Sequence, residues 1–268
     1  RLEVSTNTPK VILDLLQEGM NIDKENLYQI EGLLALDELI ELTTFNLPKL
    51  KFKEHQGITH GSLKNSQLRE QEELDTRNKS NFKSIFSIIR RNDLLVHHPY
   101  NLFSTSVEEF INQAAEDKQV MGIKMTLYRI SKDSLIIDAL IRAAEKGKQV
   151  MALVELKARF DEDNNIQWAK QLEQAGVHVV YGVIGLKTHT KIALIIRKEK
   201  NRLRTYFHIG TGNYNSKTSK TYTDIGLLSC QPELGQDLIE LFNYCLLYTS
   251  PSPRDQRGSG VAGWGWKK

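Results

Sequence analysis

The sequence has little cysteine, little net charge and no long apolar run. Its two cysteines, Cys230 and Cys245, form no C-x-x-C pair and show no His/Cys spacing, so structural zinc or a disulfide framework is not expected. No apolar run approaches the ~18 residues that a membrane span needs. A net charge of +3 over 268 residues is too small to indicate non-specific binding to nucleic acid or membrane. Any anion site must therefore come from local placement of charge.

The remaining composition is that of an ordinary globular protein. Hydrophobic residues make up 40% and charged residues 26% of the chain, which is typical of soluble domains. A chain of this length can bury a core and hold one or two domains. We find no secretory signal peptide, although the chain opens on Arg1 without a methionine, and we expect a cytoplasmic protein.

Residues 1–95 show mainly helical patterning. Thr8 is predicted to cap a helix whose first residue is Pro9, because apolar residues with helical spacing follow. A second helix is predicted at 31–42. Residues 49–83 are rich in charge and glutamine and have little periodicity. We interpret them as a surface connection to another module.

From about Asp93 strands alternate with helices of 10–15 residues, which is typical of β-α-β units and predicts an α/β fold with a largely parallel sheet. Ser106 and Glu109 have the spacing of a capping box. Strands are predicted at 119–130, 149–156 and 177–181, a hairpin at 191–196 and 203–209, and helices at 134–148, 165–176 and 234–244. Residues 245–268 break this pattern with Pro, Ser, Gly and two tryptophans. We interpret them as a non-native or disordered tail.

Polar residues follow four of the predicted strands, and functional residues gather at the carboxyl ends of strands in α/β sheets. Arginine suits bidentate contact with phosphate oxygens, and lysine supplies a point charge. Glycines at 210 and 212 would let backbone N–H groups approach an anion. The side chains expected at this site are those of Arg129, Arg159, Lys187, His189, Lys191, His208 and Lys217.

Each of these features alone also has a structural explanation. Gly210-Thr-Gly212 resembles many turns, and no G-x-x-x-x-G-K-[ST] motif of a P-loop is present. His178 is predicted to pack in or on a strand, and His97-His98 to form a domain-entry turn. Taken alone, a histidine in the position of His189 is also more often a structural residue than a catalytic one. The functional hypothesis therefore depends on the coincidence of the four loops.

These loops carry a family resemblance. The segment from about Asp93 to Tyr244 resembles the first C-terminal catalytic domain of the histidine-dependent bacterial polyphosphate kinases, a phospholipase D-like domain. The resemblance implies three parts: residues 1–80 as the end of a helical head domain, 81–244 as the catalytic domain, and 245–268 outside the match. The matching strings are DLLVHHPY (93–100), IKMTLYRISKDS (123–134), VELKARFDE (154–162), LKTHTK (186–191), HIGTGNYN (208–215) and TYTD (221–224).

The resemblance implies a phosphotransferase that moves the terminal phosphate of ATP reversibly onto inorganic polyphosphate through a phosphohistidine. His189 matches the phosphorylated nucleophile, Tyr222 a nucleotide-contacting position, and His208 a supporting histidine. Arg129 and Arg159 match positions assigned to the magnesium–phosphate site. Because a guanidinium has no lone pair to offer a metal, we interpret both as clamps on phosphate oxygens beside Mg²⁺.

Two alternatives stay open. The H-x-K of His189 and Lys191, with Asn213 in the following loop, also fits phospholipase D-like phosphodiesterases, but the aspartate usual seven residues after the histidine is Ile196 here. The other alternative is a non-catalytic polyanion-binding fragment. For the full-length kinase the implied partners are ATP, ADP and polyphosphate, without nucleic acid, in a homo-oligomer with peripheral membrane association. Activity of this chain alone is not expected.

Overall fold

A computed structural model describes residues 1–53, 55–64, 84–130, 134–155, 162–182 and 188–247. The chain divides into two compact units, Arg1–Glu54 and His55–Lys268, and each is considered by itself. None of the described helices is both long enough and apolar enough to span a bilayer. Of the predicted tail, residues 248–268 lie outside the described residues.

The first unit contains a pair of short parallel strands joined by one helix. Strand β1 (Leu2–Ser5) pairs in parallel with β2 (Leu27–Ile30), and α1 (Lys10–Gly19) lies between them in sequence. The helix is confirmed, but Pro9 is its N-cap, so it begins one residue later than predicted. Val4 and Leu13 are buried. Short 3-10 turns complete the unit: η1 (Lys24–Asn26), η2 (Leu36–Thr44) and η3 (Pro48–Leu50).

This unit is less helical than predicted. The helix expected at 31–42 is a 3-10 stretch, η2, none of whose residues is buried. The four-residue strand β1 is not predicted because Leu2 and Val4 are only two apolar residues, too few to show the alternation that identifies a strand.

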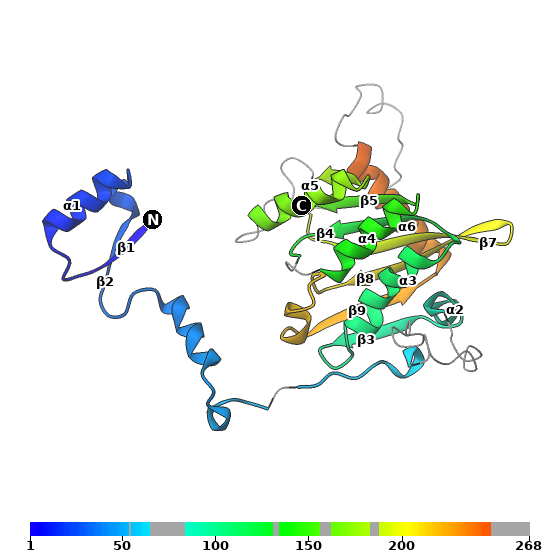
Figure 1. The fold of residues 1–268 in the computed structure, drawn as a ribbon, viewed down its shortest axis with the longest axis horizontal. Coiled ribbons are helices and arrows are strands. Elements are labelled where there is room, and N and C mark those ends of the chain that lie inside the picture. Colours follow the sequence, from blue (N-terminus) through cyan, green and yellow to red (C-terminus); the bar gives the residue numbers. More distant parts are fainter. Residues whose placement is uncertain (54, 65–83, 131–133, 156–161, 183–187, 248–268) are drawn as a thin grey trace, which may run out of the picture. The chain divides into compact units, whose positions relative to one another are not determined.

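The second unit is built on a sheet that has seven strands within the described residues, in the order β3-β9-β8-β7-β4-β5-β6 (Figure 1). The parallel part is β4-β5-β6, with one α-helix between successive strands. The four other pairings are antiparallel. The strands are β3 (Leu94–His98), β4 (Val120–Leu127), β5 (Gln149–Val154), β6 (His178–Tyr181), β7 (Lys191–Glu199), β8 (Arg202–Gly210) and β9 (Asp224–Ser229).

The α/β class and the β7–β8 hairpin are therefore confirmed, but the sheet is mixed rather than largely parallel. The prediction went wrong because β3 and β9 were not recognised as strands. β3 contains the two histidines that were assigned to an entry turn, and β9 follows a long polar loop. Their antiparallel pairing with each other and with β8 extends the sheet beyond the hairpin.

Helices cover both faces of the sheet (Figure 1). Phe86, Phe110 and Leu140 belong to the larger hydrophobic cluster on one face, whereas Phe242 of α6 packs with Phe207 on the other. Burying each such side chain contributes about 1.5–3 kcal/mol. The helices are α2 (Ile85–Ile89), α3 (Glu109–Glu116), α4 (Leu135–Glu145), α5 (Glu162–Gln174) and α6 (Pro232–Leu247), with 3-10 turns η4 (Gly61–Leu63) and η7 (Thr218–Lys220).

Ser134 and Ser106, both predicted to lie at helix starts, have different roles in the structure. Ser134 caps α4, since its hydroxyl accepts from the backbone N–H of Ile137 at 3.4 Å. The predicted capping box at Ser106 is wrong. A π-helical turn, η6 (Ser104–Glu108), precedes α3, and the buried Ser106 hydroxyl donates to the Leu102 carbonyl at 2.7 Å. Ser106 lies inside the helical segment, and its hydroxyl does not cap the helix because it donates to the preceding turn.

The strands place their polar ends at two opposite ends of the sheet. One end is called here the His189 end. Strands β4, β5 and β8 finish there, and β7 and β9 begin there, as the pairs Leu127–Val154 and Lys191–Gly210 show for the first four of these strand ends. At the other, called the hairpin end, Lys200 and Asn201 form the turn between β7 and β8.

Candidate active site

His189 lies in the short segment that leads into β7, and its side chain is exposed. The backbone on either side of it is fixed by hydrogen bonds. The Thr126 hydroxyl at the end of β4 donates to the Thr190 carbonyl at 2.7 Å and accepts from Ile192 N–H at 3.0 Å. The Thr188 N–H donates to the Glu155 carboxylate at 2.8 Å. The sheet thus presents this imidazole to solvent from a fixed backbone.

Tyr128 is the aromatic residue around which the site is arranged. Its ring lies edge-on to the His189 ring, with centroids 5.4 Å apart. The Lys191 Nζ lies 5.3 Å and the Arg129 guanidinium carbon 5.7 Å from the same centroid. One ring therefore brings together three of the predicted site residues, with cations near its π system.

Lys191 is a buried cation directly beside His189. Its side chain is only 4% exposed, and its Nζ donates to the His189 carbonyl at 2.5 Å. Burial lowers the pKa of Lys191, Asp224 opposes that shift, and the charge of Arg129 adds to it. Positive charge is therefore concentrated at the mouth of the sheet in partly dehydrated surroundings, where electrostatic interactions are strong.

The ends of β4 and β5 are joined by one amide. The fully buried Asn165 donates from Nδ2 to the Tyr128 carbonyl at 2.6 Å and to the Glu155 carbonyl at 2.9 Å. A Cβ on Gly182 would lie 3.1 Å from the Glu155 carboxylate, so a glycine leaves room for that side chain. Tyr128, Glu155 and Asn165 were not singled out from the sequence. The signal for the first two was their place at the ends of predicted strands.

His208 lies within β8 and is buried. Its Nδ1 is 2.9 Å from the Tyr214 hydroxyl, and a Cβ on Gly226 of the neighbouring strand would overlap its Nε2. Burial, and to a smaller extent His98, lowers the pKa of His208 to about 3. The ring is therefore neutral near pH 7, and its supporting role stays a prediction.

His98 is the last residue of β3, not part of an entry turn as predicted. Its buried ring places Nδ1 2.7 Å from the Asn101 carbonyl. Burial is the main reason that the pKa of His98 is lowered, against the opposing effect of Asp224. The two buried histidines come from strands on either side of β9, where Gly226 leaves space.

The glycine-rich loop after β8 is held against the start of β9. Thr211 donates to the Asp224 carboxylate at 2.8 Å, and a Cβ on Gly212 would lie 2.5 Å from the same carboxylate. Gly212 thus permits the close approach of the loop to Asp224. The buried Oδ1 of Asn213 has no hydrogen-bond partner among the described residues, so it can accept one from a ligand.

Two other predicted site residues lie in the segment between β8 and β9. Tyr222 is 63% exposed and Lys217 is exposed as well, which leaves both accessible to a ligand. Arg159 and Lys187 lie outside the described residues. Among the residues that the structure does describe, no cluster of three or more His, Cys, Asp or Glu side chains could hold a metal ion.

Known proteins resemble this chain closely. Residues 84–251 match the family "Polyphosphate kinase C-terminal domain 1". A polyphosphate kinase of Parasynechococcus marenigrum (strain WH8102) is 66% identical over 244 residues, which are 91% of this chain and 34% of the relative. A polyphosphate kinase structure from Porphyromonas gingivalis is similar with a TM-score of 0.65 and 28% identity, covering 94% of this chain and 37% of that one. The phospholipase D family member Nuc from Salmonella typhimurium has a TM-score of 0.45 and 15% identity, over 58% of this chain and 93% of its own.

The chain spans about a third of the length of the curated relatives it matches. Its family match covers the sheet, the His189 segment and the glycine-rich loop. The protein therefore belongs to the polyphosphate kinase family, of which it contains the first C-terminal domain.

Proposed function

We propose that this chain is the phosphohistidine-bearing part of a polyphosphate kinase, in which His189 accepts the terminal phosphate of ATP and passes it to inorganic polyphosphate. One observation carries this proposal. The exposed His189 imidazole shares the Tyr128 ring with two cations, Lys191 and Arg129. A nucleophile and the charges needed for a phosphoryl group are therefore placed together.

In the first step an imidazole nitrogen of His189 attacks the terminal phosphorus of ATP. A nitrogen–phosphorus bond forms, the bond to the bridging oxygen breaks, and ADP leaves with the electron pair. In the second step a terminal oxygen of polyphosphate attacks the same phosphorus and His189 is released. A histidine is largely neutral near pH 7 and so has a lone pair available. Two transfers through one nucleophile replace a difficult direct transfer between two polyanions.

The cations at the His189 end stabilise the charge that develops during transfer. Phosphoryl transfer has a loose transition state with charge on its equatorial oxygens, so positioning and electrostatics supply most of the catalysis. We assign Lys191 and Arg129 to those oxygens, together with Arg159 on the strength of the resemblance. Glu155 and Asn165 are positioning residues, because they hold the backbone of the two segments that carry His189 and Tyr128.

When Mg²⁺ accompanies ATP, it would supply positive charge that offsets the charge of the phosphate oxygens. Arg129 and Arg159 bind those oxygens rather than the metal, since guanidinium groups have no lone pair for it. The exposed ring of Tyr222 is assigned to the nucleotide, the Asn213 Oδ1 to accepting a hydrogen bond from a ribose hydroxyl, and His208 to support of the loop through Tyr214. The domain limits 81–244 and a homo-oligomeric, cytoplasmic full-length enzyme belong to the same proposal.

The test is phosphoenzyme formation in the full-length protein that carries this segment. Incubation with ATP labelled in its γ-phosphate should give a protein-bound phosphate that is acid-labile and base-stable, as expected for phosphohistidine. His189→Ala should abolish the label, and His178→Ala, which removes an exposed imidazole on β6, should retain it. A label that survives His189→Ala would overturn the assignment of the nucleophile, and turnover of a phosphodiester would favour the phospholipase D-like alternative.

A further inference from the structure

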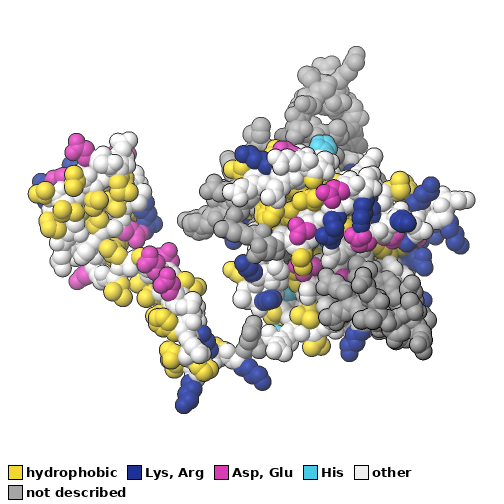
Figure 2. Space-filling model, viewed as in Figure 1, with side chains coloured by type: hydrophobic (Ala, Val, Ile, Leu, Met, Phe, Trp, Pro, Cys, Tyr) yellow, Lys and Arg dark blue, Asp and Glu magenta, His cyan; other side chains and the backbone are white. Residues whose placement is uncertain are grey.

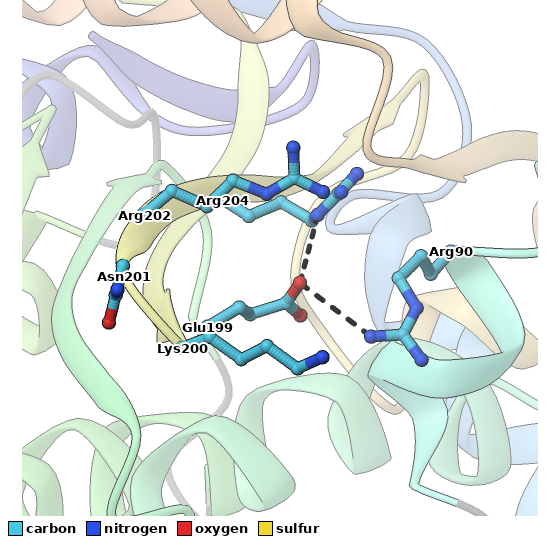
Figure 3. A pocket seen from close by; sticks show the side chains of 6 residues that line it. All are labelled: Arg90, Glu199, Lys200, Asn201, Arg202 and Arg204. Atoms are coloured by element: carbon cyan, nitrogen blue, oxygen red, sulfur yellow. Dashed lines mark hydrogen bonds and ion pairs between the residues drawn. The ribbon is translucent and has the colours of Figure 1, made fainter.

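A second cationic site lies at the hairpin end of the sheet, opposite His189. A cavity of about 670 Å³ opens there, and four of its six lining residues are cations while one is a carboxylate. The volume is in the range of small-ligand pockets. Figure 3 shows Glu199, Lys200 and Arg204 extending from the β7–β8 hairpin toward Arg90 at the end of α2, while Asn201 points away from them. The lining residues are Arg90, Glu199, Lys200, Asn201, Arg202 and Arg204.

Glu199 organises the arginines of this pocket. Its carboxylate accepts hydrogen bonds from Arg204 Nε at 3.0 Å and lies 3.6 Å from Arg90 Nη1. Arg197 Nη1 at 2.9 Å and the Tyr206 hydroxyl at 2.5 Å contact it from the other side. Although burial opposes ionisation, the hydrogen bonds from Tyr206, Arg197 and Arg204 lower the pKa of Glu199. Glu199 therefore fixes Arg90 and Arg204 and, together with Asp117, Arg197, without neutralising all of these cations.

Lys200 and Arg202 add charge that Glu199 does not balance. Neither makes an ion pair with any residue that the structure describes. Lys200 also has a φ of 51°, a left-handed conformation that glycine or asparagine would tolerate better than lysine. In Figure 3 its side chain extends past Glu199 toward Arg90. Figure 2 shows Lys and Arg side chains gathered over this hairpin.

We propose that the hairpin-end pocket is a second binding site for condensed phosphate, separate from the His189 site. Arginines held in fixed geometry suit phosphate oxygens, and lysine supplies additional point charge. The nine residues of β7 separate the two sites by roughly 26 Å, so a short polyphosphate cannot occupy both. The choice of condensed phosphate among polyanions rests on the proposed function, whereas the anion site itself rests on the pocket.

Calorimetric titration of the 268-residue chain with tripolyphosphate at low salt tests this site. We expect two classes of site. Lys200→Gln combined with Arg202→Gln should weaken one class by about tenfold or more and leave the other unchanged, while Arg129→Gln should weaken the other class. Lys51→Gln combined with Lys170→Gln removes the same charge from exposed positions outside the pocket and should leave both classes intact.

Two results would overturn the proposal. One is a titration of the Lys200/Arg202 double variant that matches that of the Lys51/Lys170 control, which would mean that the pocket binds no phosphate. The other is tighter binding of poly(U) than of polyphosphate of equal charge at the same class of sites, which would identify an RNA site. Neither result depends on phosphate transfer to His189, so the phosphoenzyme test and this test can fail independently.

Discussion

The two ends of the sheet both gather cations, but they hold them in different ways. At the His189 end, Lys191 is fixed by a backbone carbonyl and an aromatic ring, and the structure gives it no ion pair with a described residue. At the hairpin end, the Glu199 carboxylate holds Arg90, Arg197 and Arg204, and Asp117 also binds Arg197. Unneutralised charge in dehydrated surroundings suits a transient phosphoryl group, whereas an ion-paired arginine array also stabilises the fold. Substitutions should therefore change reaction rate at one end and stability or binding at the other.

The largest effect should follow removal of the Arg129 charge. Arg129→Gln should slow phosphorylation of the full-length enzyme by about 100-fold or more, roughly 3 kcal/mol, by analogy with the loss of one donor to a developing oxyanion. Single-turnover labelling by rapid quench would measure the rate. Arg91→Gln, an exposed arginine at the end of α2, should leave the rate unchanged. Equal rates for the two variants would contradict a role for Arg129 at phosphate.

At the hairpin end the corresponding change is Glu199→Gln, and it should act on stability. The variant removes the anion that pairs with Arg90 and Arg204, while Arg197 keeps its ion pair with Asp117, and we expect the free energy of unfolding to fall by about 2 kcal/mol. This is below the 3–5 kcal/mol typical of fully buried pairs, because the Arg90 side chain is 50% exposed. Urea denaturation of the chain would measure the loss.

The exposed Glu240 supplies the control for that measurement. Glu240→Gln removes a carboxylate that contacts only the neighbouring Gln236 among described residues, and its effect should stay within about 0.5 kcal/mol. If both variants lost the same stability, the Glu199 network would contribute nothing specific.

A smaller effect on rate should come from the buried carboxylate at the His189 end. Glu155→Gln keeps an acceptor for the Thr188 N–H but removes its charge, which weakens that hydrogen bond. Because Glu155 acts by positioning His189, we expect kcat to fall about tenfold while KM for ATP is unchanged, and Glu155→Asp to recover less than the native rate. Glu173→Gln on the surface is the control. A change in KM alone would indicate a role in substrate binding instead.

The parts of the molecule that could be predicted are those with local signals. The alternation of apolar residues placed β4, β5 and α4 to within a few residues, and the position of His189 before an apolar run correctly put it at the start of a strand. The sequence motif also grouped Arg129 with His189, which the Tyr128 ring now explains.

What could not be predicted depends on contacts between distant segments. Asn165 joins two strand ends through its amide, and nothing in its local pattern distinguishes it from a surface residue of an amphipathic helix. The 197–202 segment looked like a polar hairpin turn. Its role as the wall of a pocket required Arg90 from a helix about 110 residues earlier in the chain.

Between the two ends, the middle of β8 should give the smallest effect, a change of stability with pH. The pKa of His208 is lowered by burial to about 3, whereas an unfolded histidine has a pKa of about 6.5. The unfolded chain therefore binds more protons as pH falls below 6.5, and stability is lost progressively from there toward pH 3. Between pH 7 and pH 6 the loss of stability from His208 should be about 0.7 kcal/mol, and buried His98 adds a loss of the same sign.

Urea denaturation at pH 7 and at pH 6 would measure this loss. His208→Gln should reduce the stability difference between the two pH values, and His178→Gln, on the surface, should not. If the stability difference between pH 7 and pH 6 were the same in His208→Gln as in the native chain, the His208 ring would not be held neutral inside the sheet. The middle of β8 would then not be an uncharged region between the two cationic ends.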